Sequence, residues 1–144
     1  MHSEILTCVV ALVAWSLVMM FWMFFKRLPA LKRAGIDLSR ARGSKPGILD
    51  ELLEAQAQWP AHNYMHLMEQ PTLFYAVAIT LALLGAGNGV NAIIAWAYVL
   101  LRIVHSIVQA TSNKISLRFP LFVLSSAALV ALTLHAGMAI ALQR

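Results

Sequence analysis

Charged side chains are scarce in this chain. Asp, Glu, Lys and Arg together make up 12% of its 144 residues, whereas hydrophobic residues make up 60%. Soluble globular domains carry roughly a quarter charged and about half apolar residues. The composition therefore excludes an ordinary soluble domain, and it predicts an integral membrane protein that crosses the bilayer several times.

Cysteine and the common catalytic motifs are also nearly absent. The single cysteine, Cys8, excludes a disulfide within the chain, and its place in an apolar run predicts a buried thiol. No phosphate loop, no G-x-G-x-x-G and no Ser-His-Asp pattern occurs. His62 and His66 have the spacing of two zinc ligands on a helix, but no glutamate follows His62, so we expect no metal site.

Long apolar runs are what the chain does contain. Four of them reach or approach the ~20 residues that a membrane-spanning helix needs. They predict an all-α fold, a four-helix bundle that forms one integral membrane domain over residues 1–144. The first run is expected to be retained, because the residues before it are not basic as those of a signal peptide are. The expected spans are about residues 5–26, 61–85, 90–111 and 117–142, with a basic loop at about 27–49.

Two prolines are expected to interrupt the second span. Pro60 and Pro71 each remove a backbone donor and favour a kink, which a membrane helix tolerates when its neighbours compensate. Upstream, Asp50 and Glu51 follow a Pro-Gly pair, where a helix N-terminus favours negative charge. The helical structure is therefore expected to begin in water and to enter the membrane later.

Positive charge gathers in two of the connections between the spans. Lys114 and Arg118 lie between the third and fourth spans, and the turn between the second and third spans carries no charge. By the positive-inside rule both basic connections are cytoplasmic, which places both termini outside the cytoplasm. Orientation thus explains the net charge of +5, and no nucleic-acid partner is expected. The basic residues of the first connection are Lys26, Arg27, Lys32, Arg33, Arg40, Arg42 and Lys45.

Two polar stripes run along the predicted second and third spans. His62, His66 and Glu69 follow one another at spacings of four and three, so they share one helix face, with Asn63 on its flank. Polar groups avoid lipid and usually face a bundle interior, a partner or a site. The second stripe, which this one is expected to meet, is formed by Arg102, His105 and Gln109.

The two stripes have two interpretations. In the first, they hold helices or subunits together, with Glu69 and Arg102 as candidates for an ion pair at membrane depth. In the second, they form a polar pocket near the cytoplasmic face, with Lys114 and Arg118 at its mouth. Such a pocket would suit an anionic ligand.

Three segments together resemble the MAPEG family, the membrane-associated proteins in eicosanoid and glutathione metabolism, and particularly its bacterial members. The resemblance spans essentially the whole chain. In that family the second helix typically carries Asn-x-x-Glu, often followed by Pro-x-Leu-Phe-Tyr, and the third carries Arg-x-x-His. The segments that carry the resemblance are residues 66–75, 96–106 and 113–119.

The resemblance implies a fold, an activity and a set of site residues. Family members form homotrimers of four-helix protomers, and family enzymes bind glutathione between protomers near the cytoplasmic side. A transferase or peroxidase that uses glutathione as co-substrate against lipophilic electrophiles from the bilayer is implied, in a bacterial inner membrane. Arg118 matches the family arginine that stabilises the glutathione thiolate, and Glu69 would engage the amino end of the peptide. The rest of the implied pocket is His62, Asn63, His66, Arg102, His105, Gln109, Lys114 and Phe122.

The chain also departs from the family pattern. His66 stands at the signature asparagine, Trp59, His62 and Met65 stand where family enzymes place arginines, and Gln109 and Phe122 match tyrosines. Charge-assisted bonds lost with those arginines are worth about 1.5–3 kcal/mol each. The alternative is therefore a non-catalytic MAPEG-like protein that binds another anionic or lipid-like ligand. A small multidrug transporter is disfavoured, because the first span has no carboxylate.

Overall fold

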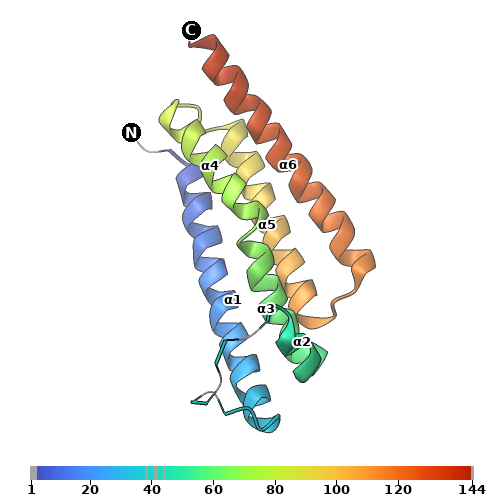
Figure 1. Cartoon of the computed structure of the whole chain (residues 1–144). Coiled ribbons are helices and arrows are strands. Elements are labelled where there is room, and N and C mark those ends of the chain that lie inside the picture. The colour runs from blue at the N-terminus through green and yellow to red at the C-terminus, as the bar shows by residue number, and fades with distance from the viewer. Residues whose placement is uncertain (1–2, 38, 41, 44, 144) are drawn as a thin grey trace.

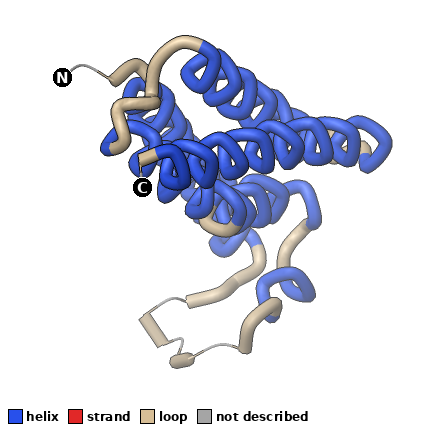
Figure 2. The backbone as a smooth tube through the Cα atoms, turned by 90° about the horizontal axis from the view of Figure 1, so that it is seen from above, coloured by secondary structure: helices blue, strands red, loops and turns tan. Residues whose placement is uncertain are grey.

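The computed structural model describes residues 3–37, 39–40, 42–43 and 45–143. All regular secondary structure in this part of the chain is helical, which confirms the predicted all-α class. The long helices lie alongside one another, and the short α2 lies to one side of them (Figures 1 and 2). The helices are α1 (Ile5–Arg33), α2 (Ile48–Leu52), α3 (Ala55–Leu67), α4 (Gln70–Leu83), α5 (Val90–Thr111) and α6 (Ile115–Leu142).

Three of these helices, α1, α5 and α6, are long and apolar enough to cross a membrane. The bounds of α5 are those predicted, and α6 begins two residues before the predicted 117. Large apolar side chains such as Phe25 and Leu83 remain exposed on the outside of the helices. An exposed apolar surface of this extent marks contact with lipid or with another protein.

The predicted second span is divided into two helices. α3 ends at Leu67 and α4 begins at Gln70, with Pro71 in its first turn. A proline ring clashes with the carbonyl four residues earlier, here that of Leu67, and removes a backbone donor, which favours a break at this point. The predicted interruption at Pro71 is thus confirmed. At Pro60 the prediction was wrong, because α3 continues through it, held against its neighbours by the buried Gln58 and Ala61 on either side.

The first helix is longer than predicted and runs beyond residue 26 to Arg33, with Pro29 inside it. Its last turns are stabilised by packing, since Ala30 and Leu31 are buried against Leu53 and Ala57. The basic connection therefore begins seven residues later than the expected 27, after the last helical residue at 33. In the same region α2 begins directly after Gly47 with two acidic residues in its first turn, as expected.

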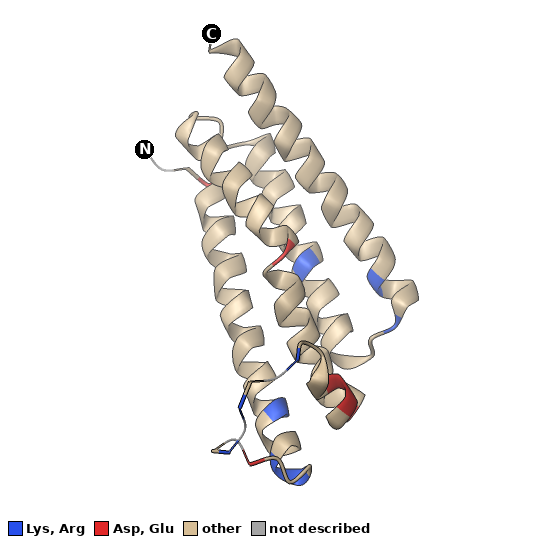
Figure 3. Cartoon of the chain, in the orientation of Figure 1, with Lys and Arg blue, Asp and Glu red and all other residues tan. Residues whose placement is uncertain are grey.

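Both ends of the described chain meet the turn between α4 and α5. The Ile5 N–H donates to the Gly87 carbonyl at 2.9 Å, and the Gln143 side chain donates to the Leu84 carbonyl at 3.3 Å. A Cβ at Gly87 would overlap the side chains of Ser3 and Ile5, so glycine permits this close approach. Figure 3 shows that most Lys and Arg residues lie at the opposite end of the helices. The two basic connections therefore lie at the same end of the helices, as the sequence predicts.

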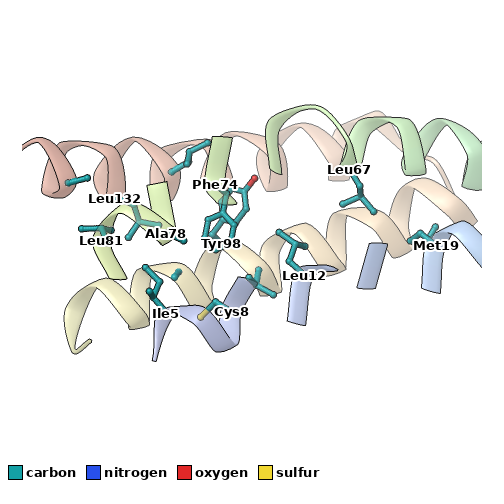
Figure 4. Close-up of a cluster of buried hydrophobic side chains, with 14 of the residues drawn as sticks. Ile5, Cys8, Leu12, Met19, Leu67, Phe74, Ala78, Leu81, Tyr98 and Leu132 are labelled. Carbon is teal, nitrogen blue, oxygen red and sulfur yellow. The ribbon is translucent and has the colours of Figure 1, made fainter. Parts of the chain in front are cut away.

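A buried apolar cluster joins α1 to α4, α5 and α6 (Figure 4). Phe74 and Tyr98 stack at its centre, with ring centroids 4.5 Å apart and planes 12° from parallel. Cys8 is fully buried in the cluster, as predicted for a structural thiol. The cluster orients α5, and with it the polar side chains that lie one to three turns further along that helix.

Candidate functional site

A pocket of about 360 Å³ lies between α3, α5 and the first turns of α6. The structure brings four predicted site residues together in its wall: His66, His105, Arg118 and Phe122. The ring of His66 stacks on Phe122 at 5.7 Å and lies 5.4 Å from the ring of His105. Ile115 and Phe119, which the spacing argument missed, complete the lining. The pocket thus combines one guanidinium and two imidazoles with apolar walls.

Arg118 is held in place by the connection that precedes α6. Its Nη1 donates to Asn113 Oδ1 at 2.5 Å, and its Nε is buried without a partner in the described residues. Asn113 has a φ of +50°, a left-handed conformation that asparagine tolerates better than most residues after a helix. The asparagine therefore both ends α5 and orients the arginine. Helix periodicity could not reveal this contact, because Asn113 lies outside a helix.

His66 is bonded to Glu69 across the break between α3 and α4. Its Nδ1 lies 3.0 Å from Glu69 Oε2. An ionised carboxylate only accepts hydrogen bonds, so Nδ1 carries the proton and Nε2 is left as the acceptor of the neutral ring. The Glu69 side chain is 70% exposed. The carboxylate thus orients the imidazole from outside the pocket.

The predicted ion pair between Glu69 and Arg102 does not form within the described chain. Arg102 is fully buried, and its Nη2 donates to the His66 carbonyl at 3.3 Å while its Nη1 lies 3.5 Å from Gln70 Oε1. The last carbonyls of a helix lack intrahelical donors and favour a nearby positive charge. Arg102 therefore binds the C-terminal end of α3 that the proline break exposes. Spacing alone could not foresee this, because the break creates the acceptor.

Two further polar contacts tie the helices together around the pocket. Asn63 Nδ2 donates to Gln109 Oε1 at 3.0 Å, so these two predicted site residues meet each other, one turn from His66 and His105. Gln70 Nε2 donates to Ser126 Oγ at 2.7 Å and links α4 to α6. Both bonds lie beside the pocket and not in its lining.

The structure places His62 outside this pocket. Its Nε2 lies 2.7 Å from Asp50 Oδ1, which also accepts from Gln58 Nε2 at 3.0 Å. The Gln58 oxygen in turn accepts from Arg27 Nε at 3.0 Å. These side chains line a separate hollow of about 190 Å³ between α1, α2 and α3. Asp50 comes from the far side of the basic connection, so the stripe could not predict it.

Lys114 also lies outside the pocket lining. It is exposed at the residue before α6, four residues from Arg118. No group of three or more His, Cys, Asp or Glu side chains that could hold a metal ion occurs among the described residues. Within the pocket itself, Arg118 is the one permanently charged side chain. The local chemistry is therefore that of a cationic site open to a small anion.

Comparison with models of known protein families matches the MAPEG family over residues 5–138, nearly the whole chain. No curated protein and no solved structure matches the chain. The matched range contains every residue that lines the pocket between α3, α5 and α6.

Proposed function

This chain belongs to the MAPEG family, and on that premise we propose that it is a glutathione-dependent transferase or peroxidase acting on lipophilic electrophiles. The observation that carries the proposal is Arg118, which Asn113 fixes in the wall of a pocket that is otherwise lined by two imidazoles and apolar side chains. A guanidinium beside a thiol favours the thiolate, which is the nucleophilic form. In this proposal Arg118 stabilises the thiolate of bound glutathione.

The remaining pocket residues would shape the glutathione site. His66, His105 and Phe122 form its wall, and Lys114 lies near its mouth on the connection before α6. Glu69 Oε1 has no hydrogen-bond partner within the described residues, so this oxygen would accept a hydrogen bond from the amino end of glutathione. Arg102, Asn63 and Gln109 hold the surrounding helices and so keep the pocket in shape.

A second pocket is consistent with the proposal that the substrate is lipophilic. It has a volume of about 390 Å³, lies between α4 and α6, and is lined almost wholly by apolar side chains. Phe122, Leu129 and Thr133 are spaced seven and four apart, so they share one face of α6, which joins this pocket to the first. We assign it to the apolar tail of the electrophile, whose reactive carbon would then lie toward Arg118.

We also propose that the protein is an integral membrane homotrimer with four crossings per chain. The fourth crossing would be α3 and α4 in succession, across the break at Glu69. Glu69 lies eight residues into the expected span at 61–85, or about 12 Å along a helix axis. A carboxylate exposed to hydrocarbon costs about 3 kcal/mol. A neighbouring protomer that covers Glu69 removes this cost and places the pocket beside a subunit boundary.

The same proposal gives an orientation. Both basic connections would face the cytoplasm, and both termini would lie outside it, in a bacterial inner membrane. The clustering of Lys and Arg at the end of the helices away from the termini supports it (Figure 3). The pocket that contains Arg118 would then open near the cytoplasmic face, where glutathione is available.

The transferase assay with glutathione and chlorodinitrobenzene tests this function on the purified protein. We expect the wild type to turn over and Arg118→Ala to lose about 100- to 1,000-fold in kcat, the loss that follows removal of one preorganised donor to a developing negative charge. Arg40→Ala is the matched control, since Arg40 is exposed on the first basic connection, paired with Asp37. No turnover by the wild type, or equal turnover by wild type and Arg118→Ala, would contradict the proposal.

One observation favours the alternative of a non-catalytic protein. His62, which stands at a family arginine position, is bonded to Asp50 and cannot clamp a carboxylate in the pocket. Such a protein would bind another anionic or lipid-like ligand through Arg118. Isothermal titration with glutathione helps to separate the two functions, because saturable binding with a Kd below about 1 mM supports the transferase and counts against this alternative.

A further inference from the structure

We propose that His66 is the general base of the reaction and takes the proton of the glutathione thiol, with Glu69 as its positioning residue. The inference rests on the proposed transferase function. It adds a catalytic group that the resemblance does not supply, since the family pattern places asparagine, which cannot act as a base, where this chain has His66.

The geometry of His66 is that of an oriented base. Its Nδ1 is engaged by Glu69 Oε2 at 3.0 Å, which fixes the tautomer and leaves Nε2 to accept a proton. Nε2 makes no hydrogen bond within the described residues, and the ring forms part of the pocket wall that also contains Arg118. Stacking on Phe122 at 5.7 Å restricts the ring from the α6 side. A carboxylate behind an imidazole that faces a pocket is the arrangement by which proteins orient and strengthen a histidine base.

The other histidine in the pocket is less suited to this role. His105 is 2% exposed, and its Nδ1 is buried without a partner in the described residues, so no carboxylate orients it. The charged and titratable groups around His66 are Glu69 at the break, Arg102 and His105 on α5, and Arg118 on α6. Of these, Glu69 is the group that hydrogen-bonds the His66 ring.

The chemical step balances without any additional reactant. His66 Nε2 takes the proton from the glutathione sulfur, which leaves a thiolate beside the Arg118 guanidinium. With chlorodinitrobenzene the sulfur then forms a bond to the ring carbon, and chloride leaves with the electron pair of the broken carbon–chlorine bond. The proton on His66 passes to water and restores the base.

The test is the pH dependence of kcat/KM for the full-length protein and for His66→Asn, which introduces the amide found in the family pattern. A thiol with an ordinary pKa of about 8.5 is only about 1% ionised at pH 6.5, so a base can supply up to ~100-fold there. We expect His66→Asn to lose 10- to 100-fold at pH 6.5 and the loss to shrink to less than 3-fold above pH 9. Added imidazole should restore part of the activity at low pH.

Two further variants keep the result interpretable. In kcat at saturating glutathione, Glu69→Gln should show a smaller loss than His66→Asn with the same dependence on pH, because the base is present but poorly oriented. Its KM for glutathione should rise at every pH, because Glu69 also engages the amino end of the peptide. His135→Asn is the matched control, since His135 is bonded to Asn91 at 2.6 Å and lies outside the pocket lining. His135→Asn should keep the wild-type profile.

The outcomes separate this inference from the function on which it rests. If the wild type shows no turnover with glutathione, the proposed function fails. If the wild type is active and His66→Asn loses activity equally at all pH values, or loses none, the base assignment alone is overturned. Ultraviolet absorption by the thiolate of bound glutathione gives a second readout. At pH 6.5 this absorbance should be lower in His66→Asn than in the wild type, although glutathione still binds.

Discussion

At the scale of single residues, Asn113 has two separable roles. Its backbone adopts a φ of +50° after α5, and its Oδ1 accepts the 2.5 Å bond from Arg118. Glycine adopts the same backbone conformation without the carboxamide. We therefore predict that Asn113→Gly folds normally but loses about 10-fold in kcat/KM with chlorodinitrobenzene, equivalent to ~1.4 kcal/mol of transition-state stabilisation.

Asn113→Ala provides the comparison. Alanine removes the same bond and in addition strains the backbone by about 1–2 kcal/mol, because its Cβ disfavours the left-handed region. Thermal unfolding in detergent should therefore show a lower midpoint for Asn113→Ala than for Asn113→Gly, with similar losses in activity. Wild-type activity in Asn113→Gly would show that Arg118 needs no fixed orientation.

Helix spacing predicted part of the candidate site. Because His66 and His105 each lie on the predicted inner face of a span, their meeting in one pocket follows from periodicity. The bond of His62 to Asp50 does not, since Asp50 belongs to a short helix reached through a long irregular connection. Asn113 was missed for a similar reason, because a contact made from a connection has no helical period.

At the scale of elements, α2 is held by side chains and not by its own helical stability. A helix of five residues is not stable in water by itself. Asp50 fixes it by accepting bonds from Gln58 and His62, and Gln58 is only 1% exposed. Removing the carboxylate leaves a buried amide unsatisfied, which costs about 1–3 kcal/mol.

We accordingly predict that Asp50→Ala exposes the connection between α1 and α3 to trypsin. A local loss of 1–2 kcal/mol raises the population of the undocked state roughly 5- to 30-fold, and cleavage should accelerate in proportion. Limited digestion in detergent, followed by mass measurement of the fragments, checks this. Glu51→Ala is the matched control, because Glu51 is exposed on the same helix and makes no side-chain hydrogen bond within the described residues. Equal cleavage of both variants would contradict the docking role of Asp50.

Hydropathy and the positions of the prolines explain which helix bounds could be predicted from the sequence and which could not. α5 was predicted at its observed bounds because its apolar run is flanked by a glycine-rich turn and a polar turn. The division of the second span was predicted at Pro71 but not at Pro60, since the propensity of a single proline does not reveal the packing that keeps α3 intact. The extension of α1 to Arg33 has the same origin, because contacts of Ala30 and Leu31 stabilise turns that the sequence marks as a loop.

At the scale of the whole molecule, the arrangement of ends and charges makes the orientation testable. The turn before α5 lies beside both described chain ends, and the basic connections lie at the other end of the helices. We predict that a cysteine placed at Val90 reacts with a membrane-impermeant maleimide in intact cells, because Val90 is 64% exposed beside that turn. A cysteine at Arg40, on the first basic connection, should react only after the membrane is permeabilised.

The native Cys8 is fully buried, so the unmodified chain should stay unlabelled in both conditions and serves as its own control. Labelling of Arg40→Cys but not Val90→Cys in intact cells would reverse the orientation, and it would move the Arg118 pocket to the side of the membrane away from cytoplasmic glutathione.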